Sequence, residues 1–265
     1  MTEAIQAILN KARLLLRPLR IYQLRWERRW YDWRSGVRFA QQQSRERLPV
    51  RLCHHQSLLL RRLGTTDPQL QQNKVVNLAL AVPPLHGLLI QPGETLSIWR
   101  RIGQPTASKG YLNGVQLSQG RVKVGVGGGL CQLANLIHWM ALHTPLELVE
   151  RHHHSFDPFP DHGRVLPFGS GASLFYNYVD LRFRNPTSQP LQLLIWLSST
   201  HLCGEIRSLR MPELAYHILE KDHHFEQLGE LRFRCNTIWQ RQVDRRNGKT
   251  VAERLLYRNR SRVMY

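Results

Sequence analysis

The chain has 265 residues, of which 42% are apolar, so it can bury a full hydrophobic core. Its formal net charge is +18, from 37 Lys and Arg residues against 19 Asp and Glu residues. No apolar run reaches the 18 or more residues of a membrane-spanning helix, and the start of the chain, which contains Glu3, lacks a signal-peptide core. We therefore expect a cytoplasmic location, with peripheral attachment to the membrane as an alternative.

The positive charge is concentrated at the ends of the chain. Residues 1–62 contain 14 Lys and Arg against 4 Asp and Glu, whereas residues 63–206 contain 10 against 8. Apolar residues such as Ile5 and Leu9 recur at helical spacing and predict a basic amphipathic helix up to Pro18. Tryptophan and tyrosine residues then alternate with arginines as far as residue 34.

We consider three roles for this basic arm. Residues 1–38 could bind an anionic membrane surface, because aromatic rings favour the interface and arginines pair with phosphate. The same helix could instead pack on the core with a solvated basic face. Nucleic acid is a less favoured partner, since no nucleic-acid-binding motif is present.

The central part of the chain predicts short elements in sequence. A helix is expected over 69–82, where Pro83 ends it, and a strand over 96–99. Segments 115–117 and 122–124 alternate in polarity and predict a hairpin that leads into a glycine-rich loop.

That loop, Gly127, Gly128 and Gly129, precedes Cys131, Gln132 and a predicted helix over 131–143. A thiol at the start of a helix is expected to have a lowered pKa, and glycine N–H groups can stabilise an oxyanion. Cys131 could equally be an inert buried thiol. The loop lacks the Lys-Ser/Thr of a P-loop and the spacing of a dinucleotide fingerprint, so we expect no cofactor.

Histidines follow the helix at the end of a predicted strand over 146–150. His152 or His154 is the candidate general base for Cys131. A second predicted strand, 174–183, carries Asp180, which should be paired in a strand interior and could orient the histidine.

The histidine cluster has two other interpretations. His152 and His154, with Asp157 or His162, could supply zinc ligands, but no thiol pair reinforces such a site and we expect no metal. The cluster could also be a hydrogen-bonded surface turn. The four cysteines (Cys53, Cys131, Cys203 and Cys235) form no Cys-x-x-Cys pair and are expected to be reduced.

The C-terminal region predicts a hairpin, because segments 232–239 and 250–257 flank the turn signal Asn247-Gly248. We therefore expect a basic helical arm over 1–72, a core domain over 73–207 and a β extension over 208–265.

Several long motifs resemble the VanW family. They are GGGLCQ (127–132), VERHHHS (149–155), LPFGSGA (166–172) and FYNYVDLRFRN (175–185), with HQSLLLR (55–61) and QPGETLS (91–97) upstream. The resemblance implies an association with B-type vancomycin resistance and cell-wall metabolism, and it brings no established reaction.

The order of the cysteine, histidine and aspartate also resembles the transglutaminase-like and papain-like cysteine hydrolases. That layout implies an α+β fold in which a mixed or antiparallel sheet packs on the helix that bears Cys131.

Two functions of different class follow. The first is a cysteine acyl transferase or amide hydrolase acting on a peptide or cell-wall precursor: Cys131 attacks, His152 or His154 moves the proton and Asp180 orients it. The second is a non-catalytic module in which the glycine loop, Gln132 and arginines such as Arg182 bind an anionic or peptidoglycan-related ligand.

Overall fold

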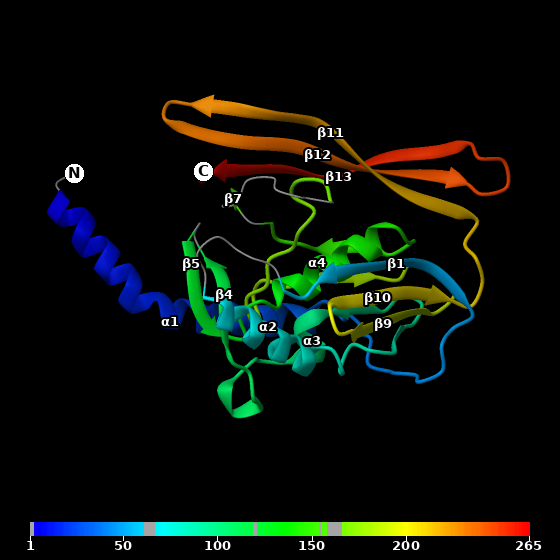
Figure 1. The fold of residues 1–265 in the computed structure, drawn as a ribbon, viewed down its shortest axis with the longest axis horizontal. Helices are drawn as coiled ribbons and strands as arrows, with labels where there is room; N and C mark the ends of the chain where they lie inside the picture. Colours follow the sequence, from blue (N-terminus) through cyan, green and yellow to red (C-terminus); the bar gives the residue numbers. More distant parts are fainter. Residues whose placement is uncertain (1–2, 61–66, 119–120, 154, 158–165) are drawn as a thin grey trace.

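A computed structural model describes residues 3–60, 67–118, 121–153, 155–157 and 166–265 of the chain. It is a mixed α+β fold (Figure 1) in which strands outnumber helices among the described residues, and these strands form four sheets. None of the described helices is both long and apolar enough to cross a bilayer.

The first element is a single long helix, α1 (Glu3–Arg34), whose N-terminal part extends away from the rest of the molecule (Figure 1). We expected this helix to end at Pro18, but it continues for four more turns. Proline removes one backbone hydrogen bond. Beyond it the helix is held on the core by ion pairs, described below, which offset that loss.

The central sheet has the strand order β1 (Val50–Leu58), β10 (His201–Ser208), β9 (Leu191–Leu197) and β2 (Leu88–Ile90), with every pair antiparallel. Strand β1 lies within residues 1–72, which we expected to form a helical arm. Its hydrogen bonds to β10 place it in the core sheet instead, so the helical arm is limited to α1.

Helix α4 (Cys131–Leu142) packs against this sheet and spans almost the range predicted from the sequence. It buries Leu133, Leu136, Ile137 and Met140. A Cβ at Gly204 of β10 would lie 2.6 Å from Met140, so glycine there permits the close approach. The expected packing of an antiparallel sheet on the cysteine-bearing helix is therefore present.

Helix α2 (Pro68–Ala81) and the hairpin of β4 (Asn113–Ser118) and β5 (Arg121–Val126) lie next to each other. The hairpin pairs Val115 with Val124 and Leu117 with Val122, which confirms the predicted register. Asn77 of α2 donates from Nδ2 to the carbonyls of Leu112 and Gly128. These bonds attach the chain just before β4 and just after β5 to the helix.

The third sheet is small, with the order β3 (Thr95–Ser97), β8 (Arg182–Arg184) and β6 (Glu147–Glu150). The predicted strand over 174–183 is wrong for most of its length. Residues 175–179 form a turn closed by hydrogen bonds between Phe175 and Val179, and only 182–184 pair in a sheet.

Trp99, predicted at the end of a strand, lies in the short helix α3 (Ile98–Ile102). The Ser97 side chain accepts a hydrogen bond from the Arg100 N–H and thereby caps this helix at its start. A 3-10 turn, η1 (Ala107–Lys109), follows α3.

The C-terminal sheet has the order β11 (Leu214–Leu228), β12 (Leu231–Asp244), β13 (Thr250–Val263) and β7 (Phe156–Asp157). The predicted hairpin about Asn247 and Gly248 is confirmed as β12 and β13, and the long strand β11 extends it. The Gln240 side chain of β12 donates to the Leu142 carbonyl at 2.7 Å, which joins this sheet to the end of α4.

Candidate functional site

A cavity of about 270 Å³ lies at the start of α4. Residues from α1, α3, the β4–β5 hairpin, the glycine loop and the 174–178 turn contribute to its walls. They include Arg25, Trp99, Lys123, Gly129, Cys131 and Tyr176. The cavity thus assembles segments that are more than 150 residues apart in the sequence.

Cys131 is the first residue of α4 and its half-buried side chain borders the cavity. Burial raises the pKa of the Cys131 thiol, and this effect outweighs hydrogen bonds from the backbone of Leu174 and of Cys131 itself. The direction is opposite to the lowered pKa that we expected from the helix start. Among the described residues no side chain caps this helix, but the Gln132 and Leu133 N–H groups already donate to the Gly129 and Leu130 carbonyls, each at 3.1 Å.

The glycine loop already uses two of the three N–H groups that we assigned to an oxyanion. The Gly127 N–H donates to the Leu112 carbonyl at 3.0 Å, and the Gly128 N–H donates to the Gly125 carbonyl at 3.1 Å. A Cβ on Gly128 would lie 2.1 Å from the backbone of Gly114. The absence of a side chain at position 128 is therefore required by packing between the loop and β4.

Gln132, a further ligand candidate, makes contacts elsewhere. Its Nε2 donates to the Ser57 hydroxyl at 2.9 Å and to the Leu58 carbonyl at 2.8 Å. These bonds join the first turn of α4 to the end of β1.

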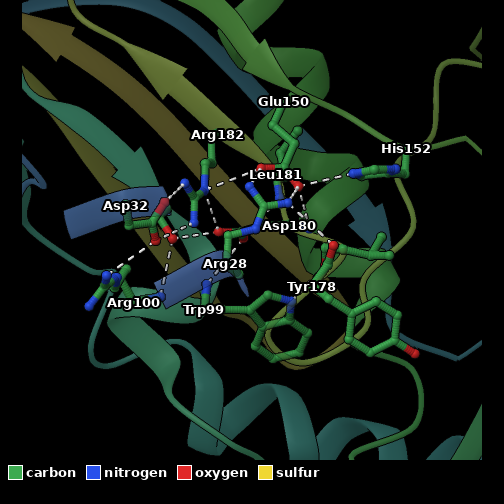
Figure 2. A network of polar contacts seen from close by, with 12 residues as sticks. Arg28, Asp32, Trp99, Arg100, Glu150, His152, Tyr178, Asp180, Leu181 and Arg182 are labelled. Atoms are coloured by element: carbon green, nitrogen blue, oxygen red, sulfur yellow. Dashed lines mark hydrogen bonds and ion pairs between the residues drawn. The ribbon is translucent and has the colours of Figure 1, made fainter. Parts of the chain in front are cut away.

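Asp180 is fully buried and belongs to a polar network (Figure 2). Its carboxylate accepts hydrogen bonds from the Ser97 hydroxyl at 2.5 Å, from the Trp99 N–H at 3.2 Å and from the Arg182 Nε at 3.0 Å. Burial raises the pKa of Asp180, opposed by the Ser97 hydrogen bond and the Arg182 charge. The prediction that Asp180 needs a partner is confirmed, and the partners described are Ser97 and Arg182.

His152 is exposed and lies at the edge of the same network (Figure 2). Its Nε2 contacts Glu150 Oε1 at 2.9 Å, and this carboxylate also accepts from the Asp180 N–H at 3.1 Å. The structure thus places His152 with Glu150, whereas Cys131 borders the cavity. His154 lies outside the described residues.

The network also attaches α1 to the third sheet. Arg182 donates twice to the buried carboxylate of Asp32, at 2.5 and 3.0 Å, and Arg28 donates twice to Glu150, each time at 2.7 Å. Arg100 adds a third cationic contact to Asp32 at 3.1 Å. The sequence did not identify Asp32 or Glu150 as members of this network. For Asp32, the available signal was its position as an acidic residue within an arginine-rich helix.

Trp99 connects the network to the cavity. Its backbone N–H binds Asp180, its indole N–H donates to the Val179 carbonyl at 2.8 Å, and its ring packs edge-on against Tyr176. Arg25 of α1 donates to the Tyr176 carbonyl at 2.7 Å. The network therefore holds the aromatic wall of the cavity in place.

Among the described residues, the one group of three metal-type ligands is His224, Glu226 and Cys235, on β11 and β12. Their ligand atoms lie within 4.8 Å of one another. Glu226 also accepts a hydrogen bond from the Arg260 guanidinium at 2.8 Å, and this positive charge disfavours a cation at the same place. Of the metal ligands considered from the sequence, Asp157 is buried beside Arg234, while His154 and His162 lie outside the described residues.

A family profile and one relative with a known name point to the same family. The sequence profile of the family described as VanW like protein matches residues 73–207. The chain is 29% identical over 262 residues to the vancomycin B-type resistance protein VanW of Enterococcus faecalis (strain ATCC 700802 / V583), which covers 97% of this chain and 95% of that protein. It is 28% identical over 118 residues to the uncharacterized protein YoaR of Bacillus subtilis (strain 168), covering 43% of this chain and 36% of that one. No solved structure matches the chain.

Proposed function

Because the chain belongs to the VanW family, we propose that the cavity at the start of α4 binds an anionic, peptide-like ligand related to cell-wall precursors. The relative from Enterococcus faecalis is named for vancomycin resistance, which motivates this ligand class. The observation that carries the proposal is the charge and shape of the cavity itself.

The charged side chains on the cavity wall are both cationic. Arg25 and Lys123 border it, and no carboxylate lies among its described lining residues. The uncapped start of α4, with its positive dipole end, adds a further preference for negative charge. A peptide C-terminal carboxylate matches this combination of two cations and a positive helix dipole.

Aromatic and amide side chains also line the cavity. Trp99, Phe175 and Tyr176 offer apolar surface, and Gln104 and Gln116 offer hydrogen-bonding groups for a peptide unit. A volume of about 270 Å³ suits a small part of a precursor and is too small for a polymer strand.

Calorimetric titration with a short peptide that ends in a free carboxylate tests this proposal. We expect binding to be at least about fivefold tighter than for the same peptide with an amidated C-terminus, because only the carboxylate pairs with the cations. The Lys123→Gln variant should weaken binding of the free acid, and Lys249→Gln, at an exposed turn of the C-terminal hairpin, is the matched control. Equal affinity for acid and amide, or no effect of Lys123→Gln, would contradict the proposal.

A second candidate function is supported by one observation, that Cys131 borders the same cavity. In a cysteine acyl transferase or amide hydrolase, the Cys131 sulfur would attack the amide carbon, a histidine would move the thiol proton to the leaving amine, and an acceptor amine or water would cleave the thioester. Two features weigh against this reading: the Cys131 pKa is raised, and His152 and Asp180 are bonded to other partners.

The Cys131→Ser variant separates the two functions. Under the binding proposal it keeps its affinity for the peptide, and mass spectrometry of the wild type finds no acyl group on Cys131. A covalent acyl adduct on Cys131, together with turnover that the serine variant lacks, would favour the enzyme.

A further inference from the structure

Helix α1 has two opposite faces along the part whose side chains are described, from Leu16 onward. One face is turned to the core: Asp32 is buried, and Ile21, Leu24, Arg25 and Arg28 are half-buried. Ion pairs and hydrogen bonds to Glu150, Arg182 and the Tyr176 carbonyl hold this face.

The other face exposes large apolar side chains, which we call the aromatic stripe. At about 100° per residue its members fall within an arc of roughly 120° opposite Asp32. They are Leu16, Leu19, Tyr22, Trp26, Trp30 and Trp33, with exposures of 58, 67, 73, 60, 46 and 79%.

This stripe is not explained by packing within the chain. The three tryptophans of the stripe are each at least 46% exposed, so they contribute little to the hydrophobic core. The exposed polar Gln23 lies within the same arc, but soluble monomers rarely expose so many large apolar side chains on one helix face, and such a surface marks an interaction site. The alternative that the arm simply packs on the core therefore accounts for one face of the helix only.

The charges beside the stripe indicate its partner. Arg29 borders it on one side, and Arg20 and Arg34 border it on the other; all three are exposed. Glu27 is an exposed acidic residue on the same side of the stripe as Arg20 and Arg34. Arg34 stacks over the Trp30 ring at 5.3 Å. Tryptophan and tyrosine favour the headgroup region of a bilayer, and arginine pairs with lipid phosphate.

We propose that α1 lies in the plane of an anionic membrane surface, with the aromatic stripe inserted at headgroup level and the flanking arginines on lipid phosphates. The helix does not need to span the bilayer for this, in agreement with its many charged residues. The proposal concerns a surface separate from the cavity and does not depend on the ligand proposed for it.

Co-sedimentation of the full chain with lipid vesicles tests the proposal. We expect binding to phosphatidylcholine vesicles that contain about 30% phosphatidylglycerol, and at least about tenfold weaker binding to pure phosphatidylcholine, because the flanking arginines require anionic headgroups. Binding should weaken as NaCl is raised from about 50 to 500 mM, since screening shortens the Debye length. Tryptophan fluorescence should shift to the blue on binding.

Two variants assign the binding to the stripe. Replacing Trp26, Trp30 and Trp33 by alanine should lower vesicle affinity at least about tenfold without changing the melting temperature, since all three side chains are exposed. The matched control replaces Leu228 and Val251, exposed at 63 and 59% on the C-terminal sheet, by alanine and should bind as the wild type does.

Three outcomes would overturn the proposal. They are absence of binding to anionic vesicles at low salt, equal binding by the tryptophan triple variant, and a stripe-dependent dimer in sedimentation analysis without vesicles. The last outcome would assign the stripe to a second copy of the chain.

Discussion

Asp32 of α1 and Arg182 of β8 lie 150 residues apart and form a buried ion pair with two hydrogen bonds, at 2.5 and 3.0 Å. Both side chains are almost completely buried, with exposures of 0 and 4%. The pair attaches the N-terminal helix to the third sheet beside the cavity.

The Asp32→Asn variant should therefore be strongly destabilised. It leaves the buried Arg182 and the adjacent Arg100 without a negative partner on α1, and breaking one partner of a buried pair costs about 3–5 kcal/mol. Since Arg182 keeps Asp180, we expect the lower end, about 3 kcal/mol, in urea unfolding. Glu27→Gln, an exposed change on the same helix, is the control and should change stability by less than about 0.5 kcal/mol. Equal stability of the two variants would contradict the role of the pair.

His138 should make the fold sensitive to acid. Burial, followed by the Arg151 charge, lowers the pKa of His138 to about 3, against the Ser170 carbonyl that accepts its hydrogen bond. Between pH of about 6.5 and 3 the unfolded chain binds a proton that the folded chain does not, so stability falls as pH falls through this window. The free energy of unfolding lost across this window is on the order of 4–5 kcal/mol.

The measurement is urea unfolding of the wild type and of His138→Gln at several pH values. Glutamine keeps a donor for the Ser170 carbonyl but does not titrate. We expect a shallower loss of stability below about pH 6.5 in the variant, whatever its stability at neutral pH. Parallel pH profiles would show that His138 is not the group responsible.

Gly128→Ala should destabilise the protein and not merely remove an activity. The new Cβ would lie 2.1 Å from the Gly114 backbone, which cannot move as the end of a flexible side chain can. Overpacking of this kind costs about 1–3 kcal/mol. Gly125→Ala is the control, because the three atoms nearest to its Cβ would all belong to the end of the Gln116 side chain, at 3.0–3.1 Å. Thermal unfolding of both variants measures the difference, and an unchanged melting temperature for Gly128→Ala would be inconsistent with this packing.

Cys131 should react slowly with iodoacetamide at neutral pH. Its raised pKa leaves little thiolate, so we expect the labelling rate, followed by peptide mass spectrometry, to keep rising through about pH 9. Cys53, whose pKa burial raises to about 12, should react more slowly still. Fast labelling of Cys131 at pH 7 would indicate an activated thiol and would favour the catalytic alternative.

Local patterns in the sequence predicted the local elements well. The hairpin of β4 and β5 has the predicted register, because alternating residues on either side of a short turn determine it. The sequence also predicted the helix over 131–142, since its apolar residues recur at helical spacing.

Tertiary contacts explain the failures. The aromatic segment 174–183 has the composition of a strand, yet hydrogen bonds between Phe175 and Val179 close it into a turn. Helix α1 was expected to end at Pro18, and its continuation depends on contacts such as Asp32 with Arg182 that span 150 residues.

The sequence predicted only part of the candidate site, because the rest depends on tertiary contacts. The glycine loop and Cys131 are adjacent in sequence, and both border the cavity. The sequence indicated that Asp180 needs a partner, but not that Ser97 and Arg182 would provide it. Arg25, which donates to the Tyr176 carbonyl at the cavity, was assigned only to the basic arm, because side-chain contacts across the fold leave no local pattern.

Helix α1 contributes Ile21 and Arg25 to the cavity wall, so the cavity is complete only while this helix is docked. A ligand that contacts these two side chains then binds the docked form more tightly than an undocked one. By thermodynamic linkage, the ligand must increase the population of the docked helix by the same factor by which docking increases affinity. Occupancy of the cavity should therefore protect α1 against limited proteolysis, and Asp32→Asn should lose ligand affinity without contacting the ligand.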